Sequence, residues 1–340
     1  MKILAFETSC DDTSIAIFDD NNLIFMDTAS QIKVHLETWW VVPEVAAREH
    51  ANAIFSVLDN VLKNSNLLLS DIDYIWVTTN PWLLPSLLTW TSVASTISTI
   101  LNIPIIPINH IQAHIFSNFL EREESEVEFP LTCLTVSWWH NDIYIMNDMW
   151  SMNKLWSSWD DAGWEAFDKA AKMMWLWYPG WPIISKLASE YELEWWKSID
   201  LFPRVWLVKK DFDFSFSGLK SSVKREVDRR KQENIWNELS INDKKQISFE
   251  FENAITEVLA WKLVNAAKEN NLKTVMLAWW VSANNKLRDE IDKLCKKNNL
   301  KFLYPKKLIY CMDNAAMIWI LTYYKIKYEQ VEKHIWVVKI

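Results

Sequence analysis

The chain has 340 residues, of which half are hydrophobic and 24% are charged, and its 36 basic and 44 acidic side chains leave a formal net charge of -8. This composition is typical of a two-domain soluble protein and excludes disordered, collagen-like and coiled-coil proteins. The four cysteines have no CxxC spacing, which favours a reducing cytoplasm over a disulfide framework. We expect no membrane span, because the longest apolar stretch, Pro85 to Ile108, is rich in Ser, Thr, Asn and Pro. We also expect no signal peptide, because the acidic residue Glu7 comes too soon after the N-terminus.

The first 130 residues alternate short apolar runs, polar turns and longer amphipathic stretches. Pro43 and Glu44 mark the start of one amphipathic helix of about five turns. The hydrophobic periodicity predicts strands and two helices in this part of the chain. The strands are expected over 2–6, 15–18, 23–25, 72–77 and 103–108, and the helices from 43 to 62 and over 83–101.

After an acidic loop at residues 121–128, the opening pattern returns, with strands expected over 131–136 and 143–146. Two halves with the same opening indicate a duplication. We therefore expect an α/β protein with an actin-like, hexokinase-like duplicated fold, whose two subdomains surround a nucleotide-binding cleft. The later elements are helices near 165–174, 183–191, 219–231 and 249–269, a strand at 274–278, a helix at 284–297, a strand at 301–304 and a helix at 313–326.

The expected subdomains are residues 1–130 and residues 131–312. The C-terminal helix, residues 313–340, is a candidate to pack back on the first subdomain.

The glycine and tryptophan contents are abnormal. The chain has 3 Gly and 23 Trp, whereas about 7% of residues are usually glycine, and the two counts together come close to a normal glycine count. Paired tryptophans stand at expected strand ends and loops, where Gly-Gly would satisfy turn geometry. These pairs are Trp39–Trp40, Trp138–Trp139, Trp195–Trp196 and Trp279–Trp280. We hypothesise that most of these positions are glycine in the living cell, encoded by a UGA codon reassigned to glycine; the alternative is a tryptophan-rich protein.

Two histidines and one carboxylate are candidate metal ligands. His110 and His114 are four residues apart just after an expected strand, so a helix would place both imidazoles on one face. Ile111 stands where a zincin protease would need glutamate, which disfavours protease chemistry. Asp313, at the start of a helix, is the third candidate, and two histidines with a carboxylate suit Fe, Zn or Mn. The alternatives are helix-terminal histidines without metal and an N-cap role for Asp313.

Several segments carry a family resemblance, and they lie at 6–13, 41–44, 109–114, 160–169, 214–220, 281–284 and 313–317. They closely resemble the bacterial TsaD-type tRNA threonylcarbamoyltransferases, once described as O-sialoglycoprotein endopeptidases, over essentially the whole chain. In that family, the positions that match many of the tryptophans are typically glycine. These are Trp39, Trp40, Trp82, Trp90, Trp138, Trp139, Trp156, Trp164, Trp175, Trp181, Trp279 and Trp280.

The resemblance implies transfer of a threonylcarbamoyl group from threonylcarbamoyl-AMP to N6 of adenosine-37, in tRNAs that read codons beginning with A. It implies that His110, His114 and Asp313 bind one metal ion per subunit, usually Fe2+, with Zn2+ or Mn2+ as alternatives. Departures from the family pattern at Asn80, Pro85, Gln112 and Asn141 affect loops and no proposed ligand. The residues expected to contact the adenylate are Thr135, Val136, Ser137, Trp138, Trp139, Asp168, Trp181 and Asn284.

Asp11 is the candidate catalytic residue, for proton removal or orientation, and a turn-capping role is the alternative. A net charge of -8 is unusual for a tRNA-binding protein, because phosphate neutralisation normally drives such binding. The resemblance implies a TsaB-like paralogue and a TsaE-like ATPase as partners in a complex, with no membrane association. The competing functions are an actin-like ATPase or metal-dependent peptidase, and an inactive scaffold if the tryptophans are real.

Overall fold

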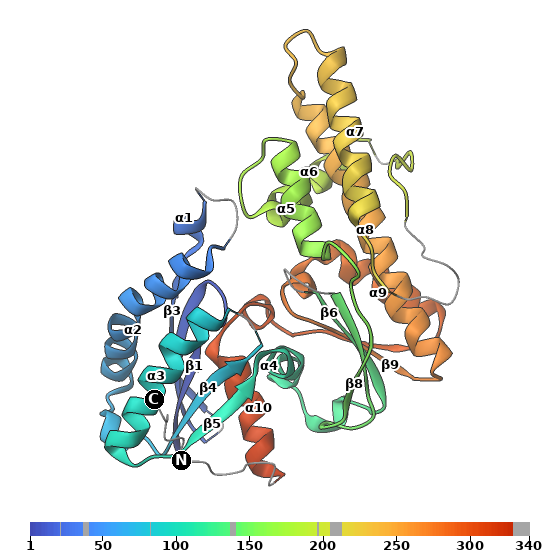
Figure 1. The fold of residues 1–340 in the computed structure, drawn as a ribbon. Helices are drawn as coiled ribbons and strands as arrows, with labels where there is room; N and C mark the ends of the chain where they lie inside the picture. Colours follow the sequence, from blue (N-terminus) through green and yellow to red (C-terminus); the bar gives the residue numbers. More distant parts are fainter. Residues whose placement is uncertain are drawn as a thin grey trace. The chain divides into compact units, whose positions relative to one another are not determined.

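The computed structural model describes residues 1–20, 22–36, 41–81, 83–136, 141–195, 197–204 and 213–328. The chain divides into two compact units (Figure 1), Met1–Glu123 with Pro305–Ile340 and Glu124–Tyr304. The boundaries expected from the sequence, after residues 130 and 312, differ from these by several residues.

The first unit contains a five-stranded mixed sheet with the order β3-β2-β1-β4-β5. β1 (Lys2–Glu7) lies at its centre, antiparallel to β2 (Asp12–Asp19) and parallel to β4 (Tyr74–Asn80). β3 (Asn22–Ser30) is antiparallel to β2, and β5 (Ile105–Asn109) is parallel to β4. The carboxyl ends of β1, β4 and β5 therefore meet at one edge of the sheet.

The helices of the first unit follow the apolar periodicity of the sequence. α2 begins with Pro43 at its first turn and ends at Ser65, and the left-handed backbone of the next residue, Asn66, stops the helix. Buried side chains of α2 and α3 pack on the sheet, with the Trp90 and Phe6 rings 5.0 Å apart. The helices are α1 (Ile32–His35), α2 (Pro43–Ser65), α3 (Leu84–Leu101), α4 (His110–Phe116) and α10 (Ala315–Lys327).

Among the described residues, one helix, α3, is long and apolar enough to cross a membrane. The core helix of a globular unit can have the same length and composition. In this structure α3 buries Leu87, Trp90 and Ala94 within the first unit, so one face of the helix belongs to the core, whereas Leu84, Leu88 and Ile100 are exposed.

The second unit repeats the arrangement of the first. Its sheet has the order β10-β9-β6-β7-β8, with β6 antiparallel to β7 and parallel to β9. The same succession of antiparallel and parallel neighbours confirms the duplicated α/β fold. β8 was not expected from the sequence, because its side chains are only partly buried or exposed. The strands are β6 (Leu131–Val136), β7 (Asn141–Met146), β8 (Met152–Trp156), β9 (Thr274–Ala278) and β10 (Lys301–Leu303).

Five helices of the second unit enclose its main core. α8 begins at Ile241, well before the expected start near Phe249, because Ser240 and Asp243 form a reciprocal capping box. The helices are α5 (Gly163–Met173), α6 (Gly180–Trp195), α7 (Ser217–Glu233), α8 (Ile241–Glu269) and α9 (Asn285–Lys297). Short 3-10 turns occur at Leu69–Asp71, Ser117–Phe119, Glu124–Glu126, Trp280–Ala283 and Leu308–Cys311.

Candidate functional site

α4 places the two candidate histidines on one face. The helix begins immediately after β5, and the Asn109 side chain caps it by accepting a hydrogen bond from the backbone N–H of Gln112 at 3.0 Å. His110 and His114 are both fully buried. Because they are four residues apart, they lie one turn apart on the same side of the helix.

Asp313 comes to these histidines from the other end of the chain. It precedes α10, and the residue that caps this helix is Asn314, whose side chain accepts a hydrogen bond from the backbone N–H of Met317 at 3.1 Å. The alternative that Asp313 is the N-cap is therefore wrong. Its carboxylate, 6% exposed, faces the histidines.

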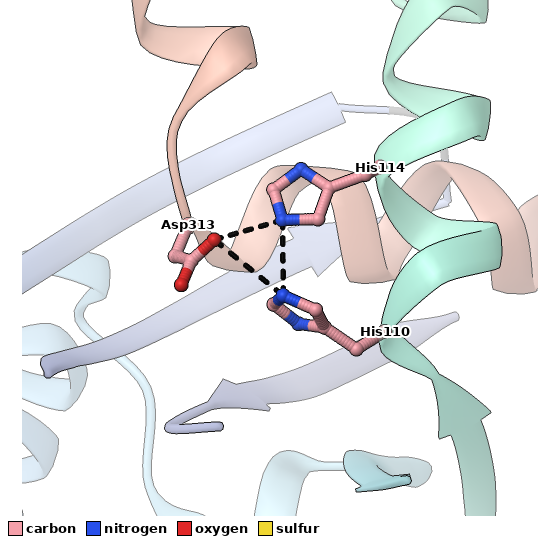
Figure 2. Close-up of side chains that lie close together, drawn as sticks. All are labelled: His110, His114 and Asp313. Atoms are coloured by element: carbon pink, nitrogen blue, oxygen red, sulfur yellow. Dashed lines mark hydrogen bonds and ion pairs between the residues drawn. The ribbon is translucent and has the colours of Figure 1, made fainter. Parts of the chain in front are cut away.

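The three side chains converge on one point (Figure 2). His114 Nε2 lies 2.8 Å from Asp313 Oδ1 and 3.0 Å from His110 Nε2, and His110 Nε2 lies 3.6 Å from Asp313 Oδ1. Two ligands of one tetrahedral ion, bound at 2.0–2.2 Å, are roughly 3.3–3.6 Å apart. The donor atoms are therefore nearly at the spacing that a metal ion requires, and the side chains can hold one.

The charges at this cluster favour a cation. Burial lowers the pKa of His114 well below its usual value, and His110 lowers it further, so His114 is neutral and retains a lone pair. Burial also acts to lower the pKa of His110, but the charges of Glu7 and Asp313 outweigh it and raise this pKa overall. For Glu7, burial acts to raise the pKa, but the charge and hydrogen bond of His110 and the hydrogen bonds of Ser9 and Thr78 bring it down to about 2. Two buried carboxylates thus create a site with excess negative charge.

Asp11 lies in the turn between β1 and β2, in the same unit as His110, His114 and Asp313. Its pKa is raised to about 6, first by burial and then by the charge of Asp313. The pKa of the adjacent Asp12 is raised to about 8 by burial and by Asp11. The field of Asp313 thus reaches Asp11, whose catalytic role stays a prediction.

Two candidate adenylate-binding residues, Thr135 and Val136, end strand β6. Thr135 pairs with Ala278 of the parallel strand β9, so the carboxyl ends of both strands lie side by side. Ligands of α/β sheets commonly bind at such ends. The next three candidates, Ser137, Trp138 and Trp139, lie outside the described residues.

Asp168 and Trp181 are brought together where α5 meets α6. Asp168 Oδ1 accepts a hydrogen bond from the backbone N–H of Gly180 at 2.7 Å. A Cβ atom on Gly180 would lie 2.7 Å from Ala171 Cβ and 2.8 Å from the carbonyl oxygen of Phe167, so only glycine fits there. Trp181 follows directly, in the first turn of α6.

Asn284 holds the turn after β9 in place. Its Oδ1 accepts a hydrogen bond from Leu287 N–H at 2.8 Å, which caps α9, and its Nδ2 donates to Glu252 Oε1 at 2.7 Å. Ser185 lies 3.2 Å from the same amide nitrogen. Glu252 could not be recognised from the sequence, because nothing distinguishes one acid inside a long amphipathic helix.

Indole rings pack together beside these nucleotide-binding candidates. The Trp164 ring lies 5.3 Å from that of Trp181 and 5.8 Å from that of Trp280. Within the described part of the chain, the buried indole N–H groups of Trp164 and Trp181 have no hydrogen-bond partner, although buried indoles usually have one.

Two tryptophans have backbones that suit glycine. Trp279 has φ 78° and ψ -174°, a region almost restricted to glycine, and Trp175 has φ 55°. Both positions belong to the set for which the sequence suggests glycine.

The neighbours of His110 were not predicted from the sequence either. Glu7, Ser9 and Thr78 form a buried hydrogen-bonded group behind its Nδ1 atom. The available signal was a glutamate at the end of an otherwise apolar strand, since such a buried carboxylate requires partners.

A family model described as "TsaD: tRNA N6-adenosine threonylcarbamoyltransferase" matches residues 22–320. The protein of that name from Persephonella marina is 39% identical over 331 residues, covering 96% of this chain and 91% of the relative. The one from Fusobacterium nucleatum is 38% identical over 334 residues, covering 98% and 94%. The chain belongs to the TsaD family.

The TsaD match includes all three metal-ligand candidates and begins after Asp11. A solved structure, component A of (R)-2-hydroxyglutaryl-CoA dehydratase from Acidaminococcus fermentans, aligns with 96% of this chain and 99% of its own length. Its TM-score is 0.52 and its sequence identity is 12%. This likeness concerns the fold alone, and it agrees with a duplicated actin-like fold.

Proposed function

We propose that this chain transfers the threonylcarbamoyl group of threonylcarbamoyl-AMP to N6 of adenosine-37, in tRNAs that read codons beginning with A. The products are threonylcarbamoyladenosine in the tRNA and free AMP. The observation that carries this proposal is membership of the TsaD family, with 39% identity over 96% of the chain to a named transferase. The chain is thus an acyltransferase.

The chemistry suits a protein that mainly positions its reactants. The adenine N6 attacks the carbamoyl carbon, an N–C bond forms, the bond between that carbon and the phosphate oxygen breaks, and N6 loses one proton. AMP is a good leaving group, so orientation and stabilisation of charge supply most of the remaining rate enhancement. Asp11 is the proposed group for orienting N6 or receiving its proton.

His110, His114 and Asp313 are the proposed ligands of one divalent ion, with Fe2+ first and Zn2+ or Mn2+ as alternatives. When bound, such an ion supplies a Lewis acid and an orienting centre. The convergence of three buried donor atoms supports this assignment. The protein holds both imidazoles on one helix and the carboxylate at the start of another.

The adenylate is proposed to bind at the carboxyl ends of β6 and β9. The contacts would come from Thr135, Val136, Ser137, Asp168 and Asn284, and from the backbone at positions 138, 139 and 181. Indoles at positions 164, 181 and 280 occupy space in this region, so the proposal includes glycine at these positions in the cell. The positive φ angles at positions 175 and 279 support glycine at these two positions as well.

The proposed setting is a cytoplasmic complex with tRNA, a TsaB-like paralogue and a TsaE-like ATPase. The net charge of -8 supports a shared binding surface, because partners can supply the positive charge that tRNA requires.

The direct test is transfer by the full chain with its partner proteins, tRNA and threonylcarbamoyl-AMP, measured by mass spectrometry of the digested nucleosides. We expect modified adenosine at position 37, and loss of both metal and transfer in His110→Ala. An Asp59→Asn variant, altered at an exposed acid of α2, is the control. Unchanged transfer in His110→Ala contradicts the metal assignment. Hydrolysis of ATP or a peptide by this chain alone, together with no transfer to tRNA in the full mixture, contradicts the transferase.

The glycine hypothesis has its own test, peptide mass mapping of the protein isolated from its own cells. Glycine masses at positions 164, 181, 279 and 280 are expected. Tryptophan masses there would mean that the nucleotide region is filled, and they would favour an inactive scaffold.

A further inference from the structure

Glu7 stands directly behind the proposed metal ligand His110. It is the last residue of β1, and the parallel register that pairs Phe6 with Val77 brings it beside Thr78 of β4. Its side chain is fully buried. Because β1, β4 and β5 end at the same edge, the carboxylate meets the start of α4.

Each oxygen of the Glu7 carboxylate has a defined partner. Oε1 accepts a hydrogen bond from the backbone N–H of Ser9 at 2.7 Å, and Oε2 accepts one from the Thr78 hydroxyl. Oε2 also lies 3.2 Å from His110 Nδ1. The backbone and hydroxyl donors leave the carboxylate little freedom to move, so its position relative to the imidazole is set by the sheet.

We propose that Glu7 is a positioning residue that accepts the Nδ1 proton of His110 and so keeps the Nε2 lone pair directed at the metal site. This inference rests on the metal site of the proposed function. An ionised carboxylate can only accept hydrogen bonds, so it selects one tautomer of the ring. Carboxylates commonly orient histidine ligands in this way.

The charge of Glu7 acts in the same direction as its geometry. When both imidazoles are neutral, as metal ligands must be, Glu7 and Asp313 leave two negative charges around them, which one divalent cation balances. Ser9 Oγ lies 2.9 Å from the same Nδ1 atom, but a hydroxyl can donate as well as accept and carries no charge. It therefore neither selects the tautomer nor attracts the ion.

The test measures Co2+ binding by the full chain. Titration gives the affinity, and visible absorption reports the ligand geometry. We expect Glu7→Gln to weaken Co2+ binding about 10–100-fold and to change the spectrum, because an amide is neutral and can face the ring with either a donor or an acceptor. Ser9→Ala is expected to stay within about twofold of the wild type.

The matched control is Glu250→Gln, which removes a fully buried carboxylate from the second unit. Glu250 accepts hydrogen bonds from the backbone of Ile199 and from the Ser198 hydroxyl, both at 2.8 Å. We expect this variant to keep wild-type Co2+ affinity. A folded Glu7→Gln protein with wild-type affinity overturns the role of Glu7, whereas a wild-type protein that binds no Co2+ overturns the metal site and this inference with it.

A second measurement needs no substitution. In the Zn2+-loaded wild type, labelled with 15N at histidine, NMR should find the proton of His110 on Nδ1. A proton on Nε2 overturns the proposal even if Glu7→Gln fails to fold.

Discussion

At the level of single residues, position 175 has a backbone conformation that favours glycine but carries a tryptophan side chain. The backbone N–H of Trp175 bonds to the carbonyl of Lys172, and that of Leu176 to Ala171, which closes α5 with a left-handed residue at 175. Helix ends of this kind favour glycine. The indole itself is 78% exposed, so it contributes little packing in return.

We therefore expect Trp175→Gly to raise the free energy of unfolding by about 0.5–1 kcal/mol, measured by chemical denaturation. The left-handed penalty of about 1–2 kcal/mol is relieved, and a weak contact between Lys231 Nζ and the ring, 5.9 Å from its centre, is lost. The control is Trp177→Gly, equally exposed but outside the left-handed region, which should destabilise slightly. Equal effects of both substitutions would contradict this explanation.

His50 connects the fold of the first unit to pH. Its ring lies 2.8 Å from the Thr13 hydroxyl and 3.0 Å from the carbonyl of Cys10. Burial lowers its pKa to about 4. The unfolded chain therefore binds a proton near pH 6.5 that the folded protein accepts only near pH 4, and stability is lost as the pH falls through this window.

His50→Gln should remove about 3 kcal/mol of this acid destabilisation between pH 6.5 and pH 4. Denaturation curves of wild type and variant across this range measure the difference. If the two proteins lose stability in parallel, His50 does not carry the effect.

At the level of elements, the start of α4 is held by its cap, Asn109, directly before the first helical residue, His110. The helix is one of the shortest in the chain, and Asn109 provides a side-chain cap immediately before His110. The position of the proposed metal ligands thus depends on a helix terminus, where caps contribute most.

Asn109→Ala is expected to cost about 1 kcal/mol of stability and to weaken Co2+ binding, because the first turn carries His110. Ser240→Ala removes the cap of α8 and should cost a similar amount without changing Co2+ affinity. Thermal unfolding and Co2+ titration of both variants provide the comparison. Equal Co2+ affinities of Asn109→Ala and Ser240→Ala would show that the cap of α4 is not needed to position His110.

At the level of the whole molecule, two units share one strand order, but different candidate residues lie at their sheet edges. The proposed metal ligands lie in the first unit, and the proposed adenylate contacts lie in the second. In the proposed function, the duplicated scaffold thus carries different chemistry in its two halves.

A metal that binds only the folded chain should stabilise it. With free ion at about 100 times its dissociation constant, the gain is about 2.7 kcal/mol, which corresponds to a rise of roughly 5–10 °C in the melting temperature of the first unit. Calorimetry with Co2+, and again with a chelator, measures this shift. His110→Ala should show none; an equal shift in that variant would place the ion elsewhere.

Much of the architecture could be predicted because it depends on local pattern. Apolar periodicity located most strands and helices, although it missed the poorly buried β8 and placed the start of α8 too late. The spacing of His110 and His114 predicted a shared helical face, because the helical repeat alone determines it. The position of Asp313 before an expected helix made it the third candidate, and the family motifs added the nucleotide-binding candidates.

By itself, the sequence determined the duplicated order of elements and the residue types of the candidate site, since both are properties of neighbouring residues. Only the tertiary structure decided that Glu7 and Thr78 stand behind His110, and that Asp313 meets His114. These facts depend on strand register and on residues about 100 or 200 positions apart in sequence meeting at one sheet edge. The left-handed backbones at 175 and 279 belong to the same class, because the path of the folded chain, and not the residue type, imposes them.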